Sequence, residues 1–226
     1  MIFKVVCIWI ILWPLQSFLA NVVTNCPDIC QCKTTSENSS YIRVKCGGIK
    51  NMSVSDWKEV QLTDITALVV SLDLSNNAFP ILQSEDFHNL TQLKRLDLSS
   101  NMLRKIDKDT FADALPNLER LKLSNNALRH IYSGSFELMS NLKHLDISNN
   151  PLVCNCDLIW LLAWTNDRSI KLQPSPKCES PVYFKGTFLK KLKVGVDLHC
   201  ESPLQTLLEL TPYKNQVNII GLVHKK

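Results

Sequence analysis

The sequence has little glycine, only a small excess of charge, and none of the short motifs that identify common enzyme classes. Six of its 226 residues are glycine, which excludes a collagen-like or flexible low-complexity chain. The formal net charge of +4 is too small to predict nucleic-acid binding. No GxSxG, HExxH or phosphate-loop motif is present, and no motif places a nucleophile beside His144 and Asp146, which superficially resemble an acid–base pair. The sequence therefore predicts neither an enzyme nor a nucleic-acid-binding protein, and it predicts no cofactor and no metal site.

Long apolar runs are also missing beyond the first twenty residues. Lys4 gives a short basic start, an uninterrupted apolar run covers residues 5–13, and residues 14–20 are smaller and more polar. This order is typical of a secretory signal. A membrane anchor is the alternative, but the run is shorter than the roughly 20 residues that a transmembrane helix requires. We therefore expect residues 1–20 to be removed and the chain to have no other membrane span.

The cysteines support export. Cys7 lies within the expected signal, and the other eight form two clusters of four. The clusters are Cys26, Cys30, Cys32 and Cys46, and then Cys154, Cys156, Cys178 and Cys200. An even number of cysteines in an exported chain predicts disulfides. Two four-cysteine zinc sites are the alternative, although neither cluster has the paired CxxC knuckles of zinc ribbons.

Three asparagines stand in glycosylation sequons. They are Asn38 before Ser-Ser, Asn51 before Met-Ser and Asn89 before Leu-Thr, and none has proline in the middle position. In an exported protein each is a candidate for N-glycosylation and would then face solvent.

An internal repeat lies between the two cysteine clusters. Segments 69–79, 93–103, 118–128 and 142–152 align on an asparagine at positions 77, 101, 126 and 150, at separations of 24, 25 and 24 residues. The second copy reads Leu93-Lys-Arg-Leu96-Asp-Leu98-Ser-Ser-Asn101-Met-Leu103. This pattern, LxxLxLxxNxL at this period, is identified as the leucine-rich repeat.

The spacing of the repeat has a physical interpretation. Leu-x-Leu directs two apolar side chains to one face of a short strand, and strands of successive turns are expected to stack in parallel as one curved sheet. The repeated asparagine is expected to turn inward and hydrogen-bond the backbone that the turning chain leaves unpaired. The predicted core behind the sheet comprises Leu82, Ile106, Ile131, Phe87, Phe111 and Phe136, with Leu90, Leu115 and Leu138 closing the convex side.

The first cysteine cluster resembles the N-terminal cap of extracellular leucine-rich-repeat proteins. The resemblance rests on Cys26-Pro-Asp-Ile-Cys30-Gln-Cys32 followed by Cys46. It implies the pairs Cys26–Cys32 and Cys30–Cys46, although four cysteines allow three connectivities. Residues 41–45 alternate as a strand does and are expected to pair with the first repeat strand. Leu62, Ile65 and Leu68 are expected to form a degenerate first turn.

The second cysteine cluster resembles the C-terminal cap of the same proteins. It begins at Cys154-Asn-Cys156-Asp157, and Asp157 is the expected N-cap of a helix that brings Trp160 and Trp164 over the last repeat. The resemblance implies the pairs Cys154–Cys178 and Cys156–Cys200.

The segment from Cys200 to Val217 resembles the link from such a cap into the immunoglobulin domain of A-subgroup adhesion-type G-protein-coupled receptors. In those receptors the chain continues through further extracellular domains and seven transmembrane helices, whereas this sequence departs after Val217 and stops at Lys226. A soluble truncated form, or decoy, of such a receptor is therefore one interpretation.

These observations predict an α/β solenoid, a short leucine-rich-repeat horseshoe with a curved parallel sheet and disulfide caps at both ends. The expected divisions are a signal peptide (1–20), an N-terminal cap with a degenerate first turn (26–68), about four repeats (69–152), a C-terminal cap (153–200) and a disordered, linker-like tail (201–226).

The predicted function is an extracellular protein-binding module, either secreted or at the cell surface as part of a longer receptor. A preformed curved face suits a protein ligand. The candidate contact residues on the concave face are Ser71, Asp73, Arg95, Asp97, Arg120, Lys122, His144 and Asp146, with Ser75, Ser99, Ser124 and Ser148 following on the same strands. Arg95, Arg120 and Lys122 are the expected anchors. The alternative is that these positions are only the solvated surface of a scaffold.

A glycosaminoglycan-binding matrix protein is another interpretation. Four lysines of the C-terminal cap, Lys185, Lys190, Lys191 and Lys193, form a basic cluster that could give a weak glycosaminoglycan contact. An ordinary solvated loop explains the same cluster, and salt-sensitive heparin binding would distinguish the two.

Overall fold

The computed structural model describes residues 26–35, 40–48, 52–60, 62, 65–108, 110–111, 115–193, 196–198 and 200. The chain divides into two compact units, Met1–Leu192 and Lys193–Lys226. The expected signal, the tail from residue 201, Asn38 and Asn51 lie outside the described residues. No helix in the described ranges is both long and apolar enough to cross a membrane.

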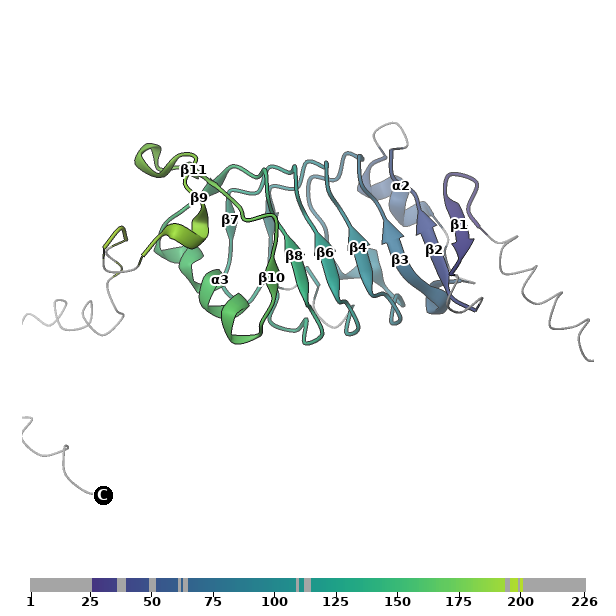
Figure 1. Ribbon diagram of the computed structural model, residues 1–226. Coiled ribbons are helices and arrows are strands. Elements are labelled where there is room, and N and C mark those ends of the chain that lie inside the picture. The colour runs from purple at the N-terminus through teal and green to yellow at the C-terminus, as the bar shows by residue number, and fades with distance from the viewer. Residues whose placement is uncertain are drawn as a thin grey trace, which may run out of the picture. The chain divides into compact units, whose positions relative to one another are not determined.

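One seven-stranded sheet dominates the first unit (Figure 1). Its strands, in spatial order, are β1 (Gln31–Thr34), β2 (Ile42–Lys45), β3 (Val69–Asp73), β4 (Arg95–Asp97), β6 (Arg120–Lys122), β8 (His144–Asp146) and β10 (Lys171–Leu172). β1 is antiparallel to β2, and each later strand is parallel to its neighbour. The predicted solenoid with a curved parallel sheet is therefore confirmed.

The repeat period sets the register of this sheet. Leu72, Leu96, Leu121 and Leu145 pair strand by strand, and all four are buried. A one-residue slip would turn these leucines to solvent, so burial fixes the register. The residues on either side of each leucine consequently point away from the core, which determines the composition of the outward face.

The core behind the sheet consists of the predicted aromatic and aliphatic residues. Phe87, Phe111 and Phe136 are buried, and the rings of Phe87 and Phe111 lie 5.7 Å apart. Elements on this side are η1 (Thr66–Leu68), η2 (Ser84–Phe87) and the parallel pair β5 (Lys105–Ile106) and β7 (His130–Ile131). The prediction for Leu138 is wrong: its side chain is 56% exposed, and Met139, 1% exposed, fills the core instead.

The repeated asparagines form a ladder of hydrogen bonds, as the repeat pattern predicts. The Asn101 amide nitrogen donates to the carbonyls of Leu74 and Leu98, both at 3.0 Å, and its oxygen accepts from Phe79 N at 3.2 Å. Asn126 and Asn150 repeat this arrangement one and two turns later. Each asparagine therefore joins the end of its own strand to the preceding turn.

The N-terminal cap contains two disulfides, Cys26–Cys32 and Cys30–Cys46, the connectivity that the resemblance implied. β2 pairs with β3 and covers the first repeat strand. Leu62 and Ile65 are buried as expected, whereas Leu68 is only half-buried. Disulfide-bonded cysteines exclude the alternative of a zinc site in this cluster.

A short helix in this cap, α2 (Val54–Glu59), was not expected from the sequence. Its Trp57 is buried, and the indole N–H donates to the Asp86 carbonyl at 2.8 Å. The side chain of Asp86 is fully buried, with Lys58 Nζ 3.3 Å from Oδ1 and Gln83 N donating to Oδ2 at 2.7 Å. The helix thus ties the cap to the turn of η2.

Ser53 determines where α2 begins, because its hydroxyl accepts from Asp56 N while the Asp56 carboxylate accepts from Ser53 N at 2.7 Å. Replacing Ser53 with alanine removes one half of this capping box. We expect the free energy of unfolding to fall by about 1 kcal/mol, measured by urea denaturation. Ser53→Thr retains both the N-cap hydroxyl and the Asn51 sequon and serves as the control, and equal stability of both variants would contradict the assignment.

The C-terminal cap is held by the Cys154–Cys178 disulfide and by the pairing of β9 (Leu152–Val153) with β11 (Cys178–Ser180). Cys156 and Cys200 are each disulfide-bonded, and their pairing with one another stays a prediction. The short helices η3 (Val182–Phe184) and η4 (Leu189–Lys191) complete the described part of the first unit.

Helix α3 (Cys156–Asp167) covers the end of the repeats. The Trp160 indole donates to the Ile131 carbonyl at 3.1 Å, and the Trp164 ring lies 5.8 Å from that of Phe136, so both tryptophans cover the last repeat as expected. The expected N-cap is wrong: the cap is Asn155, which has an extended backbone. Asp157 stands in the first turn, where its negative charge favours the helix N-terminus.

Candidate functional site

The outward side chains of the sheet lie in two rows, one residue per strand. The registers align Lys33, Arg43, Ser71, Arg95, Arg120, His144 and Lys171 across all seven strands. We call this set the basic row. Two residues further along the strands, the registers align Lys45, Asp73, Asp97, Lys122 and Asp146, which we call the mixed row. The eight predicted contact residues all lie in these two rows.

The aspartates of the mixed row close the turns that follow the strands. Oδ1 of Asp73 accepts from Ser75 N at 2.9 Å, and Asp97 and Asp146 accept from Ser99 N and Ser148 N, each at 3.0 Å. Three of the predicted contact residues therefore have a structural role in the turn. The Asp-x-Ser spacing of the repeats is the sequence signal for this turn. The sequence analysis predicts these aspartates only as ligand-contacting residues.

The third repeat has Lys122 where the others have aspartate, and this lysine reaches across to Asp97. Its Nζ lies 3.0 Å from Asp97 Oδ2. Burial opposes ionisation of Asp97, but hydrogen bonds from Ser99 and Lys122 outweigh it and lower the pKa of the carboxyl. The hydrogen bond to Asp97 raises the pKa of Lys122 in turn. The charges of the mixed row are thus largely balanced within the row.

The basic row has no such balance. Its five permanent cations, Lys33, Arg43, Arg95, Arg120 and Lys171, are all exposed. Among the described residues, none of these five side chains makes an ion pair or a side-chain hydrogen bond. The row contains no acidic residue. Unpaired cations on a rigid sheet leave five charged donors directed at solvent or at a partner.

His144 is the titratable member of the basic row. Burial lowers the pKa of the imidazole, and the positive charges of Arg120, Lys171 and Lys143 lower it further, while Glu119 acts in the opposite direction. Glu119 is itself bound to Lys143, with Oε2 and Nζ 3.2 Å apart. Asp146 accepts hydrogen bonds from Ser148. His144 and Asp146, which superficially resemble an acid–base pair in the sequence, therefore lie in different rows and have different partners.

The caps contribute residues to this face that the sequence interpretation did not select. Arg43 could have been found, because residues 41–45 alternate and were expected to pair with β3. Lys171 had no such signal, since it follows a cap helix rather than a repeat. Other residues predicted to lie on the concave surface are not exposed there. The structure buries Ser75, Ser124 and Ser148, because the chain turns inward at the end of each strand.

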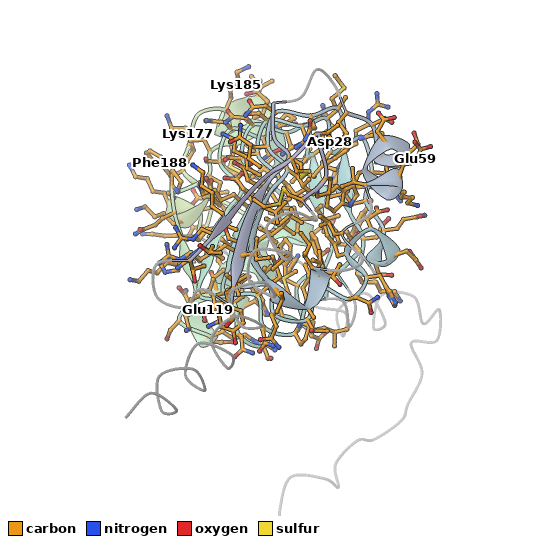
Figure 2. The ribbon with its side chains drawn as sticks, turned by 90° about the vertical axis from the view of Figure 1, so that its right-hand side faces the viewer. Asp28, Glu59, Glu119, Lys177, Lys185 and Phe188 are labelled. Atoms are coloured by element: carbon orange, nitrogen blue, oxygen red, sulfur yellow. A yellow bond between two sulfur atoms is a disulfide. The ribbon has the colours of Figure 1, made fainter. Side chains whose placement is uncertain are left out.

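The lysines predicted to bind glycosaminoglycan are in part already engaged. Lys185 forms an ion pair with Glu179. Lys191 Nζ lies 5.7 Å from the centre of the Phe188 ring, and Lys177 Nζ lies 5.1 Å from the same centre. Figure 2 labels Lys177, Lys185 and Phe188 on one side of the unit. Lys193 belongs to the second unit.

The one described sequon lies away from the two rows. Asn89 is exposed and has a left-handed backbone, with φ of 64°. With Trp57, His88 and other residues of α2 and η2 it lines a hollow of about 250 Å³. A glycan at Asn89 would therefore leave the sheet face accessible.

Comparison with known proteins gives the same fold. Residues 91–152 match the family model described as leucine rich repeat. Among solved structures, human 5T4 (Wnt-activated inhibitory factor 1, trophoblast glycoprotein) is 27% identical, with a TM-score of 0.52 over 60% of this chain and 49% of that one. The chain thus spans about half the length of that protein. No curated protein matches the sequence. Because 268 chains of solved structures match, the fold alone does not identify a ligand.

Proposed function

We propose that this leucine-rich-repeat protein is an extracellular protein-binding module whose ligand contacts the outward face of the seven-stranded sheet. The observation that carries the proposal is the basic row, in which five exposed cations have no partner among the described residues. Arg95 and Arg120 stand at the centre of this face on neighbouring strands, and arginine is enriched among residues that dominate binding energy. An open, preformed surface suits a protein rather than a small molecule.

Export is supported by the cysteines. Three disulfides are defined, and Cys156 and Cys200 are also disulfide-bonded. Such bonds persist in oxidising compartments. The similar protein 5T4 is described as a glycoprotein, which agrees with the proposed glycosylation of Asn38, Asn51 and Asn89. We keep the relation to adhesion-type receptors, as a truncated form or decoy, as a proposal that rests on the sequence of residues 200–217.

The test of the proposal places a glycan on the sheet face. Ser71→Asn with Asp73→Thr creates a sequon in the middle of β3, whereas Ser133→Asn creates one at an exposed position outside both rows. The secreted proteins are tested against an array of extracellular ectodomains by surface plasmon resonance. We expect the unmodified protein and the Ser133→Asn variant to bind the same ectodomain, and the glycan on β3 to abolish binding.

Two results would contradict the proposal. Binding that survives a glycan on β3, with occupancy confirmed by mass spectrometry, would place the contact elsewhere. Retention of the protein inside cells with free thiols and residues 1–20 attached would remove the basis for an extracellular role. A gain of about eight protons on reduction is the expected mass change for four disulfides.

A further inference from the structure

The register of the sheet brings together cations that are far apart in the sequence. Lys33 and Arg43 come from the N-terminal cap, Arg95 and Arg120 from the repeats, and Lys171 from the C-terminal cap. Adjacent strands lie about 4.8 Å apart, so the seven strands spread these charges over about 29 Å. No single repeat contains this pattern, and the two caps supply three of the five permanent charges.

The mixed row beside it constrains which anionic partner fits. Asp73, Asp97 and Asp146 follow the basic row at a distance of two residues, or roughly 7 Å along the strands, and their side chains are fixed by hydrogen bonds to the turns. A chain that is uniformly anionic on all sides would meet these carboxylates and be repelled. A protein segment presents acidic side chains in one direction and neutral or basic ones in another, so it can contact both rows favourably.

We propose that the basic row binds an acidic segment of a partner protein, with Arg95 and Arg120 as the central carboxylate-binding residues. This inference rests on the proposed function, of which it specifies the ligand chemistry. The guanidinium group offers a planar pair of donors that matches a carboxylate. Lys33, Arg43 and Lys171 extend the contact to both ends of the sheet. An extended segment of roughly nine residues is long enough to span the row.

His144 makes the contact sensitive to pH. The charged groups that act on it are Arg120 and Glu119 from the neighbouring repeat, Lys171 from β10, and Lys143, which directly precedes it in the chain. Burial and the surrounding cations lower the pKa of His144, so the row carries five permanent charges near neutral pH and gains a sixth as the pH falls. An acidic ligand favours the protonated imidazole, and its affinity therefore rises as the pH is lowered toward about 5.5, where glutamate remains ionised.

The experiment measures binding of a fluorescein-labelled peptide in which glutamate alternates with glutamine, so that an extended chain presents its carboxylates on one side only. Binding of this alternating-glutamate peptide to the full secreted chain is measured by fluorescence anisotropy at low salt. A peptide of the same length with glutamine in place of glutamate controls for non-electrostatic binding. Arg95→Glu with Arg120→Glu reverses two charges of the row, and Arg104→Glu with Arg129→Glu reverses two exposed arginines outside both rows. Thermal unfolding of each variant confirms that it is folded.

We expect the alternating-glutamate peptide to bind and the all-glutamine peptide not to bind. The Arg95→Glu, Arg120→Glu variant should lose at least about tenfold in affinity, because each reversed charge removes an attraction to the peptide carboxylates and adds a repulsion. Arg104→Glu with Arg129→Glu should bind with nearly unchanged affinity. His144→Gln should retain binding at neutral pH but lose the increase in affinity at lower pH.

Three results of these binding measurements would overturn the inference. One is equal loss in both arginine pairs, which would indicate a general charge effect. Another is absence of binding of the alternating-glutamate peptide by the folded protein. The last is tighter binding of a heparin oligosaccharide than of a peptide of equal charge, which would assign the row to sulfated polysaccharide. If an ectodomain found by the glycan test binds the Arg95→Glu, Arg120→Glu variant unchanged, the proposed function stands and only the acidic-segment inference fails.

Discussion

Replacing Asn126 with aspartate destabilises the protein by at least about 4 kcal/mol at neutral pH, more than replacement with alanine does. The amide nitrogen of Asn126 donates to the carbonyls of Leu98 and Leu123, both at 3.0 Å, and the amide oxygen accepts from Leu103 N at 3.0 Å. Aspartate keeps the acceptor but directs a carboxylate oxygen at two buried carbonyls. The carboxylate either remains charged, with one oxygen against two carbonyls and no donor for that oxygen, or binds a proton, and both cost folding free energy.

The alanine variant separates the loss of the amide hydrogen bonds from the cost of burying a carboxylate. The Leu98 carbonyl also accepts from Asn101, and the Leu123 carbonyl from Asn150, so both acceptors keep a partner when Asn126 is truncated. Only Leu103 N is left without its acceptor. We therefore expect Asn126→Ala to cost about 3 kcal/mol, from one unpaired N–H and a small cavity.

The aspartate variant also has a distinct pH dependence. Burial raises the pKa of the introduced carboxyl in the folded state, so its destabilisation is greatest above that pKa and diminishes as the pH falls through it. Urea denaturation at several pH values measures the effect. Asn125→Asp, at the exposed neighbouring position, is the matched control and should be nearly neutral. Equal stability of the Asn126 aspartate and alanine variants at neutral pH would contradict the proposed role of the amide donor.

The repeats were predictable because each of their features recurs with the same geometry. The leucines at positions 96, 121 and 145 give a strand and its buried side, and Asn101 and Asn126 give the turn that follows. The caps were less predictable, because no second copy defines their register. Helix α2, whose Trp57 joins the cap to η2, and the exposure of Leu138 both depend on contacts between turns, which the spacing of residues in one turn does not specify.

The candidate site was predictable in position but not in chemistry. The alternation of the repeats placed Arg95 and Arg120 on the outward face, but only the register across strands shows that they continue a row from Lys33 to Lys171. The side-chain contacts then separate this row from the aspartates, which hydrogen-bond to the turns. The sequence alone favours Arg95, Arg120 and Lys122 as anchors, but it does not show that Lys122 pairs with Asp97.

Removing the Cys154–Cys178 disulfide by replacing both cysteines with alanine destabilises the protein by about 3 kcal/mol or more, because the bond closes a loop with a sequence separation of 24. Both cysteines are buried, and Cys154 N donates to the Ser180 carbonyl at 2.7 Å, so the bond joins β9 to β11 at the point where α3 begins. Loosening this cap uncovers Phe136 and the end of the repeat core. The Cys26–Cys32 bond closes a much shorter loop, with a sequence separation of 6. Its removal is expected to lower the free energy of unfolding by about 2 kcal/mol.

Urea denaturation and limited proteolysis of the two double variants measure this difference. The variant lacking Cys154–Cys178 should unfold at lower urea concentration than the variant lacking Cys26–Cys32. Its first cleavages should fall in residues 153–192, because the cap that covers the last repeat opens before the sheet does. The Cys26→Ala, Cys32→Ala variant is the matched control for loss of a disulfide as such. A reversed order of stability, or early cleavage within the repeats, would show that the C-terminal cap is not the element on which the last repeat depends for its burial.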